Sequence, residues 1–276
     1  MPRSTNAGKP QKPQYTARTA DKHILYQESV QSPESEVDFC RRIYRKRHGE
    51  NPTTFREDFC GTFLISCDWV KRGPKNHAYG IDLHKPTIDW GRKHNLSRLK
   101  PDAQKRVHIL QENVLNVTSP KVQVVGAFNF SYFIFKHRDE LVAYFTAVRK
   151  SLKPGGVFIL DAYGGWDSQK AMEEKRKCEG FTYVWHQAEY NPPDDHTLCH
   201  IHFHFPDGTK MRKAFTYDWR LWTLGGIRDA LISAGFKGTE VYWEGTTADG
   251  EGDGVFRKAE RAENCNSWTA YIVGVT

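Results

Sequence analysis

The spacing of hydrophobic residues divides the chain into two parts that meet near Gly164. Before this point, nearly continuous apolar runs are separated by segments in which apolar residues recur every three or four positions. The first pattern is typical of strands buried on both faces, and the second of amphipathic helices. Strands that alternate with helices predict a parallel sheet covered on both sides. The expected strands are 53–56, 77–81, 107–111, 122–134 and 157–161, and the expected helices are 32–48, 63–71, 85–95 and 137–152.

After Gly164 the hydrophobic period changes to alternation. Residues 182–190, 197–205 and 210–219 alternate apolar and polar positions and are separated by turn sequences. Such segments predict antiparallel strands with one covered face and one free face. They are also rich in aromatic and His side chains, which can wall a pocket. We therefore expect residues 179–222 to form an inserted antiparallel cap over a ligand pocket. A dimer interface or a stabilising flap is the alternative.

The carboxyl-terminal part returns to the first pattern. Residues 223–234 predict a helix, residues 238–243 and 267–275 predict two strands, and the Gly- and acid-rich segment 244–254 predicts a mobile loop. Together the elements predict an α/β fold. We expect a doubly wound, mostly parallel seven-stranded sheet with an antiparallel β insertion.

Composition changes the picture mainly at the amino terminus. Residues 1–20 contain many Pro, Lys, Thr and Gln and hardly any large apolar residue, so we expect a disordered basic tail ahead of one domain over 21–276. The net charge is +7, and we interpret it as solvated surface rather than a nucleic-acid patch because no recognition motif accompanies it. No apolar run reaches the about 20 residues of a membrane span. The six cysteines form no C-x-x-C pair. These features predict a soluble, cytoplasmic protein with reduced thiols.

Residues 53–83 carry the clearest functional signal. They read as a strand, a tight turn, a helix and a second strand that ends in Asp82. This arrangement is typical of sites for ribose-containing cofactors, because the turn approaches the ligand and the acid accepts hydrogen bonds from the ribose hydroxyls.

The composition of the turn separates two classes of cofactor. A dinucleotide needs several glycines so that the backbone can approach the pyrophosphate. Gly61 is the only glycine in this turn, and Phe59 and Phe63 stand where the other two would fall. The turn also holds Glu57 and Asp58, which suit a cationic ligand. S-adenosylmethionine has a sulfonium and an ammonium but no phosphate, so the turn favours it over NAD(P).

Several segments, taken in order and spacing, resemble the class I S-adenosylmethionine-dependent methyltransferases. They are Glu57–Phe63, Asp82, Glu112–Val114, Asn129–Ser131, Leu152–Leu160 and Leu231–Phe236. The resemblance covers about residues 50–276, and it implies S-adenosylmethionine as the cofactor. Asn113 stands where the family commonly has an acid beside the adenine. Together with Tyr26 of an expected amino-terminal lid, the implied cofactor-binding residues are Glu57, Cys60, Gly61, Thr62, Asp82, Leu83, Asn113, Val114, Asn129, Phe130 and Ser131.

Methyl transfer is an in-line displacement at an activated sulfonium, so the protein chiefly aligns the acceptor and excludes water. A base is needed only where the acceptor must lose a proton. Asn129 interrupts an apolar strand, and Asp161 and Tyr163 follow the fifth strand at the open edge of the sheet. We expect these three residues to form the catalytic site, with a small molecule as acceptor. The alternatives are an NAD(P)-dependent oxidoreductase on a similar sheet and a non-catalytic interaction protein.

His200, His202 and His204 alternate with apolar residues and therefore share one face of a strand. Three imidazoles can bind zinc or iron. Residues on one straight strand converge poorly on a single ion, so we expect no metal. We interpret the histidines as a polar strand face, which the acceptor pocket could use as a wall.

Overall fold

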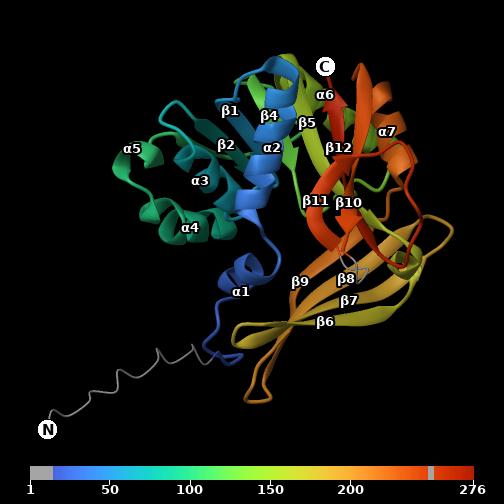
Figure 1. Ribbon diagram of the computed structural model, residues 1–276. Coiled ribbons are helices and arrows are strands. Elements are labelled where there is room, and N and C mark those ends of the chain that lie inside the picture. Colours follow the sequence, from blue (N-terminus) through green and yellow to red (C-terminus); the bar gives the residue numbers. More distant parts are fainter. Residues whose placement is uncertain (1–14, 248–251) are drawn as a thin grey trace, which may run out of the picture.

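Two β-sheets form the frame of the protein, which a computed structural model describes over residues 15–247 and 252–276. The large sheet has eight strands in the order β11-β10-β12-β5-β4-β1-β2-β3, and the small sheet has four in the order β6-β7-β8-β9 (Figure 1). The small sheet lies across one end of the large sheet, next to the amino-terminal helix α1 (Lys22–Ser29).

The parallel half of the large sheet confirms the expected α/β architecture. Its strands are β1 (Thr54–Asp58), β2 (His77–Asp82), β3 (Val107–Gln111), β4 (Val122–Ala127) and β5 (Leu152–Gly164). They pair in parallel, whereas β12 (Trp268–Val275) runs antiparallel between β5 and β10 (Gly238–Thr246).

The sheet has one strand more than expected, because β11 (Gly252–Lys258) pairs with β10. Both strands extend into the segment 244–254, where a mobile loop was expected; residues 248–251 lie outside the described ones.

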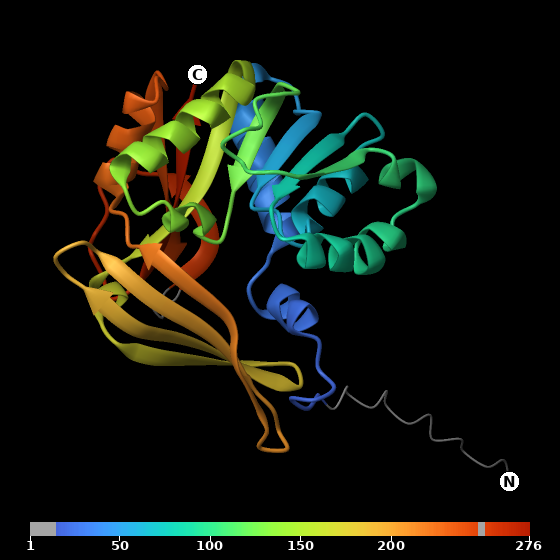
Figure 2. The ribbon, with the colours of Figure 1, turned by 180° about the vertical axis from the view of Figure 1, so that it is seen from behind.

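Helices cover both faces of the large sheet, as a doubly wound fold requires. On one face are α2 (Pro33–His48), α3 (Leu64–Lys71) and α4 (Lys85–His94), whose apolar residues share a core with β1 and β2. On the other face are α6 (Arg138–Ser151) and α7 (Leu224–Ser233), seen in front of the sheet in Figure 2. Short turns complete the set: η1 (Leu96–Arg98), α5 (Pro101–Gln104), η2 (Ser131–Ile134) and η3 (Trp166–Gln169). No described helix is long and apolar enough to cross a membrane.

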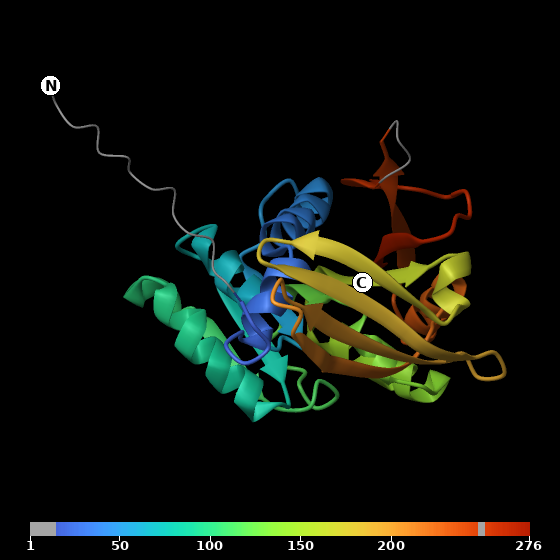
Figure 3. The ribbon, with the colours of Figure 1, turned by 90° about the horizontal axis from the view of Figure 1, so that it is seen from below.

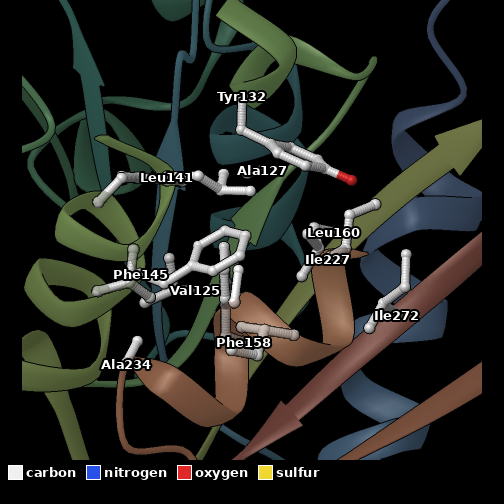
Figure 4. Close-up of a cluster of buried hydrophobic side chains, with 14 of the residues drawn as sticks. Val125, Ala127, Tyr132, Leu141, Phe145, Phe158, Leu160, Ile227, Ala234 and Ile272 are labelled. Atoms are coloured by element: carbon white, nitrogen blue, oxygen red, sulfur yellow. The ribbon is translucent and has the colours of Figure 1, made fainter. Parts of the chain in front are cut away.

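The apolar core under α6 and α7 explains why these helices pack on this face of the sheet. Apolar side chains three or four positions apart on α6 point toward the central strands (Figure 4). Leu141 and Phe145 from α6 meet Phe158 and Leu160 from β5, and all four are fully buried. Burial of a side chain of this size contributes roughly 1.5–3 kcal/mol, so the packing fixes α6 on the sheet.

The fourth strand is shorter than the hydrophobic pattern indicates. It was expected over 122–134, but β4 ends at Ala127. Asn129 and Phe130 have left-handed backbones, with φ of 56° and 57°, and η2 follows. Residues in this conformation cannot continue a strand. Phe128, Tyr132 and Phe133 beyond Ala127 are still buried, which explains why the sequence reads as one continuous strand.

The small sheet confirms the antiparallel insertion and enlarges it. Its strands are β6 (Met172–Cys178), β7 (Phe181–Asn191), β8 (His196–His204) and β9 (Lys210–Arg220), which Figure 3 shows side by side. The last three match the expected strands. The first was not expected, so the cap begins at Met172 rather than at residue 179. The limit at residue 222 also includes Leu221 and Trp222, which belong to the main core.

The ordered chain begins before residue 21. The Tyr15 ring lies 6.2 Å from that of Phe181, and the Ala17 nitrogen donates to Thr209 Oγ1 at 2.9 Å. Disorder over 1–20 is therefore wrong for residues 15–20, because these residues pack on the cap. Residues 1–14 lie outside the described part of the chain.

Candidate active site

The turn after β1 keeps the backbone of a glycine-rich turn although two phenylalanines occupy it. Phe59, Gly61 and Phe63 all have left-handed backbones, with φ of 55°, 52° and 48°. This conformation costs a non-glycine residue about 1–2 kcal/mol. The two rings offset that cost by burial on opposite faces of the sheet. Phe59 packs at 5.5 Å from Tyr144, and Phe63 is fully buried in the core beneath α3.

Asp82 at the end of β2 holds this turn in place. Its Oδ2 accepts a hydrogen bond from the Gly61 nitrogen at 2.8 Å, and its Oδ1 accepts one from the His84 nitrogen at 2.7 Å. A side chain added at Gly61 would meet no protein atom closer than Thr87 Cγ2 at 3.8 Å. Leu83, next to the acid, is 63% exposed. The turn therefore offers an open space flanked by a carboxylate and an uncovered apolar side chain.

The other predicted residues of the turn lie below its surface. Thr62 is buried, and its hydroxyl accepts a hydrogen bond from Gln27 Nε2 at 2.8 Å, which ties α1 to the turn. Cys60 is also buried, and burial raises the pKa of its thiol well above the usual value. A thiol in this state does not ionise at neutral pH and is no nucleophile. Cys60 fills the space beside Gly80, where a Cβ would come within 2.9 Å of its sulfur.

Both acids of the turn have partners inside the protein. Glu57 Oε2 accepts hydrogen bonds from the Ser66 nitrogen at 2.8 Å and from the Ser66 hydroxyl at 2.5 Å, so it caps the first turn of α3. Burial raises the pKa of Glu57 to about 8. Asp58 pairs with Arg56 at 2.6 Å and accepts from the Tyr144 hydroxyl at 2.9 Å. Both acids therefore have structural partners within the protein, and their presence in this turn does not by itself indicate a cationic ligand.

The turn after β3 is ordered by its own polar side chains. Glu112 Oε1 accepts from the Asn113 nitrogen at 2.7 Å, and Asn113 Oδ1 accepts from the Leu115 nitrogen at 3.0 Å. Val114 is buried, and its carbonyl accepts from Arg56 at 3.1 Å. Because β1, β2 and β3 are neighbours, this turn lies at the same sheet edge as Gly61 and Asp82.

Asp161 organises the edge between β4 and β5. Its two carboxylate oxygens accept hydrogen bonds from the Asn129 nitrogen at 2.7 Å and the Phe130 nitrogen at 2.9 Å. Burial raises the pKa of Asp161 to about 7 although these bonds favour the ionised form. The hydroxyl of Ser131 donates to the Phe128 carbonyl at 2.8 Å. Ser131 thus has a local backbone partner, whereas Asn129 and Phe130 face a cavity.

This cavity measures about 500 Å³ and lies between the large sheet, the cap and the segment that joins α1 to α2. The three predicted catalytic residues, Asn129, Asp161 and Tyr163, all line it, as does Tyr26 of the expected lid. Residues that the sequence did not single out complete its walls: Ser29, Val30, Ser32, Ser35, Glu36, Glu174, Arg176, Ile201, Glu244, Gly254, Phe256, Thr269 and Tyr271.

The cap supplies the aromatic wall of the cavity. Its rings include Trp185 from β7, 6.4 Å from Tyr163, and Tyr217 and Trp219 from β9, whose rings stack at 4.3 Å. Alternating segments rich in aromatic residues are the signal that predicted this wall, and in the structure these three rings line the cavity. Glu36 gave no such signal, because an acid in the first turn of a helix has an ordinary explanation.

The histidine face of β8 does not line the cavity. Ile201 does, so the neighbouring His200 and His202 point to the opposite side of the cap sheet. There His186 Nδ1 and His202 Nε2 lie 3.2 Å apart, and Glu173 is close by. The Lys213 nitrogen donates to His202 Nδ1 at 2.7 Å. With Nδ1 accepting this bond, neutral His202 carries its proton on Nε2 and can donate it to His186 Nδ1.

Comparisons with known proteins show the fold. Neither a protein-family model nor a curated protein sequence matches the chain. Among solved structures, an S-adenosylmethionine-dependent methyltransferase from Clostridium acetobutylicum is 18% identical, with a TM-score of 0.65 over 91% of this chain and 96% of that one. The CcbJ methyltransferase from Streptomyces caelestis is 13% identical, with a TM-score of 0.65 over 90% and 98%. The sugar N-methyltransferase KedS8 from Streptoalloteichus is 16% identical, with a TM-score of 0.60 over 100% and 97%. The chain thus has the fold of the S-adenosylmethionine-dependent methyltransferases.

Proposed function

We propose that the protein transfers a methyl group from S-adenosylmethionine to a small molecule bound under the cap. The observation that carries this proposal is the position of Asn129 and Phe130. They stand between the sheet edge formed by β1, β2 and β3, where the cofactor would bind, and the cavity beside β5. A methyl donor on the first side and an acceptor on the second would meet at this point.

The residues present fit the cofactor. Asp82 would accept hydrogen bonds from the ribose hydroxyls, since each of its oxygens bonds one backbone nitrogen and keeps a free lone pair. Leu83 would lose its exposure against the adenine. Gly61 leaves the approach to the turn open. Bound S-adenosylmethionine would supply an activated methyl group. The neighbours in fold include one solved with S-adenosylmethionine bound, the amino pentose methyltransferase CalS10.

The protein's own part in the reaction is alignment and exclusion of water. Asp161 fixes the backbone of Asn129 and Phe130 through two hydrogen bonds and so sets the wall between the two ligands. The cap covers the acceptor side with aromatic rings. Exclusion of water and a fixed line of approach are the main contributions that a sulfonium methyl donor requires.

Calorimetry tests the cofactor and mass spectrometry tests the transfer. In calorimetric titrations, the protein is expected to bind S-adenosylmethionine and to give no heat of binding when NADPH is added. Incubation with a small-molecule extract and S-adenosylmethionine carrying a deuterated methyl group is expected to yield products with a mass shift of one labelled methyl. Binding without any labelled product would favour the non-catalytic alternative, and binding of NADPH alone would favour the oxidoreductase.

We also propose that the protein acts in the cytoplasm and binds no nucleic acid. All six cysteines are free, which suits a reducing compartment. The homodimer stays an alternative use of the cap; sedimentation at several protein concentrations tests it.

A further inference from the structure

Glu36 in the first turns of α2 is a buried carboxyl group of the cavity, and one of its oxygens has no hydrogen-bond partner among the described residues. The side chain is only 6% exposed, and the oxygen without a partner is Oε2. Burial and the nearby carboxyl groups of Asp161 and Glu57 raise the pKa of Glu36 well above its usual value. A buried carboxyl group without a partner is costly, and native proteins rarely keep one without a reason. Because Glu36 lines the cavity, a ligand there can supply the missing partner.

The charges around the cavity specify the kind of partner. Four acids line it, namely Glu36, Asp161, Glu174 and Glu244, against the single cation Arg176 among the described residues. The Arg176 guanidinium already donates to the Ser29 carbonyl and lies 5.2 Å from the Tyr183 ring centroid. The acids therefore exceed the available cations, and a positively charged ligand would restore the balance.

The aromatic walls favour the same ligand. Many of the cavity's remaining side chains are rings, and the negative face of an aromatic ring attracts a cation. Rings at the end near Glu36 include Tyr26 and Tyr271; burial, and after it the carboxyls of Glu36 and Asp161, raises the pKa of both hydroxyls. Carboxylates and aromatic faces together favour an ammonium, because a neutral hydroxyl group can donate a hydrogen bond to a carboxylate but carries no positive charge for the carboxylate and the rings to attract.

We propose that the methyl acceptor is an amine, bound as an ammonium with Glu36 as its counter-ion and proton acceptor. This inference rests on the proposed methyl transfer. The ammonium gives one proton to the Glu36 carboxylate, and the nitrogen lone pair that this frees attacks the methyl carbon. The carbon–sulfur bond breaks, and its electron pair stays on sulfur. The products are an N-methylated ammonium and neutral S-adenosylhomocysteine.

Paired ligands test the preference without any turnover. The protein is first saturated with S-adenosylhomocysteine. Affinities are then measured by calorimetry for three pairs that differ in an amine against a hydroxyl: tryptamine and tryptophol, tyramine and tyrosol, glucosamine and glucose. In at least one pair the amine is expected to bind ten times more tightly or better. Glu36→Gln is expected to remove that preference, whereas Glu34→Gln, an exposed position in the same turn of α2, is expected to keep it.

Three outcomes would overturn the inference. In the first, no amine binds more tightly than its hydroxyl counterpart. In the second, Glu36→Gln retains the amine preference. In the third, Glu36→Gln weakens S-adenosylhomocysteine itself tenfold, which would make Glu36 the partner of the cofactor's ammonium. If the wild-type protein fails to bind S-adenosylhomocysteine at all, the proposed function fails instead. Glu36→Asp, which keeps the charge but withdraws it from the cavity, serves as a second variant and is expected to reduce the preference at least threefold.

Discussion

Asp161 and Asn129 are joined by a hydrogen bond of 2.7 Å from the Asn129 backbone nitrogen to the Asp161 carboxylate. The bond connects β5 to the turn after the neighbouring strand β4, and it reaches a residue whose backbone is left-handed, with φ of 56°. Asn adopts this conformation more easily than most residues. The Asp161 side chain on β5 thus determines the shape of the turn after β4, and with it the part of the cavity wall formed by Asn129 and Phe130.

The pH dependence of stability is expected to report on Asp161. Its pKa is about 7 in the folded protein against an ordinary value of 3.8. Between these values the folded state holds a proton that the unfolded state has released, so stability falls as pH rises through this window. The side chain of Asp161→Asn cannot titrate. As pH rises, the free energy of unfolding of this variant is therefore expected to fall less steeply than that of the wild type, and the two slopes differ by up to about 1.4 kcal/mol per pH unit.

Thermal and urea unfolding of both proteins from pH 4.5 to 8 measures the two slopes. Glu57 also has a raised pKa and contributes equally to both proteins, because Asp161 is not among the groups that raise it. Asp161 does raise the pKa of Glu36, so the difference between the slopes reports on Asp161 together with its effect on Glu36. Parallel curves would show that Asp161 titrates normally.

Asp82→Ala is expected to lower the affinity for S-adenosylmethionine at least tenfold while the fold survives. The variant loses the ribose hydrogen bonds, each worth roughly 1.5–3 kcal/mol when the acceptor is charged, and it releases the Gly61 nitrogen. Calorimetry measures the change. Asp89→Ala is the matched control, because Asp89 lies on α4 in exposed ion pairs with Lys85 and Arg92. Equal affinities for the two variants would remove Asp82 from the cofactor site.

Trp185→Ala is expected to raise the acceptor KM at least tenfold and to change the affinity for S-adenosylmethionine less than twofold. The indole lies in the wall of the cavity on the cap, 6.4 Å from the Tyr163 ring, and away from the Gly61 turn. Initial rates with an acceptor found in the labelling experiment give the KM. Trp166→Ala is the control, since that side chain is 58% exposed and does not line the cavity. If Trp185→Ala weakens cofactor binding as much as acceptor binding, the cap does not carry specificity.

Gly91→Ala in α4 is expected to destabilise the protein, against the usual effect of alanine in a helix. A Cβ at this position would lie 2.6 Å from Phe63 Cε1 and 2.7 Å from the Thr62 carbonyl oxygen. Relief of such contacts in a packed core typically costs about 1–3 kcal/mol. In α7, a Cβ at Gly225 would have no neighbour within 4 Å, so Gly225→Ala is expected to stabilise by up to about 1 kcal/mol. Urea denaturation measures both, and equal effects would contradict the steric argument.

The sequence predicts those parts of the fold in which each segment carries its own hydrophobic pattern. The strand, turn, helix and strand over 53–83 appear in the structure as β1, α3 and β2. The edge strand β6 could not be predicted, because five of its seven residues, Glu173–Lys177, are charged and exposed. It becomes a strand only through its hydrogen bonds with β7. Pairing with a neighbouring strand produces no hydrophobic period in the sequence of β6 itself.

The candidate site was predictable to the extent that it follows strand ends. Asn129 follows the end of β4, whereas Asp161 and Tyr163 lie within β5, which continues to Gly164 instead of ending before them; all three line one cavity. Glu36 reaches the same cavity from a helix about 125 residues earlier in the chain. Its role depends on how α2 approaches β12, and no local pattern encodes that approach. For the histidines of β8, the sequence correctly predicted that they share one face of the strand. It did not predict that the opposite face, with Ile201, lines the cavity.

The contact between Phe63 and Gly91 has a consequence for how this site can vary among relatives. The ring of Phe63 occupies the space that a side chain at position 91 would need. A chain with glycine at position 63 leaves that space empty, and a larger residue at position 91 can then fill it. The two positions should therefore exchange together, with one bulky side chain per pair. An alignment of relatives would show this as a correlated substitution between the turn and α4, with the volume of the pair held nearly constant.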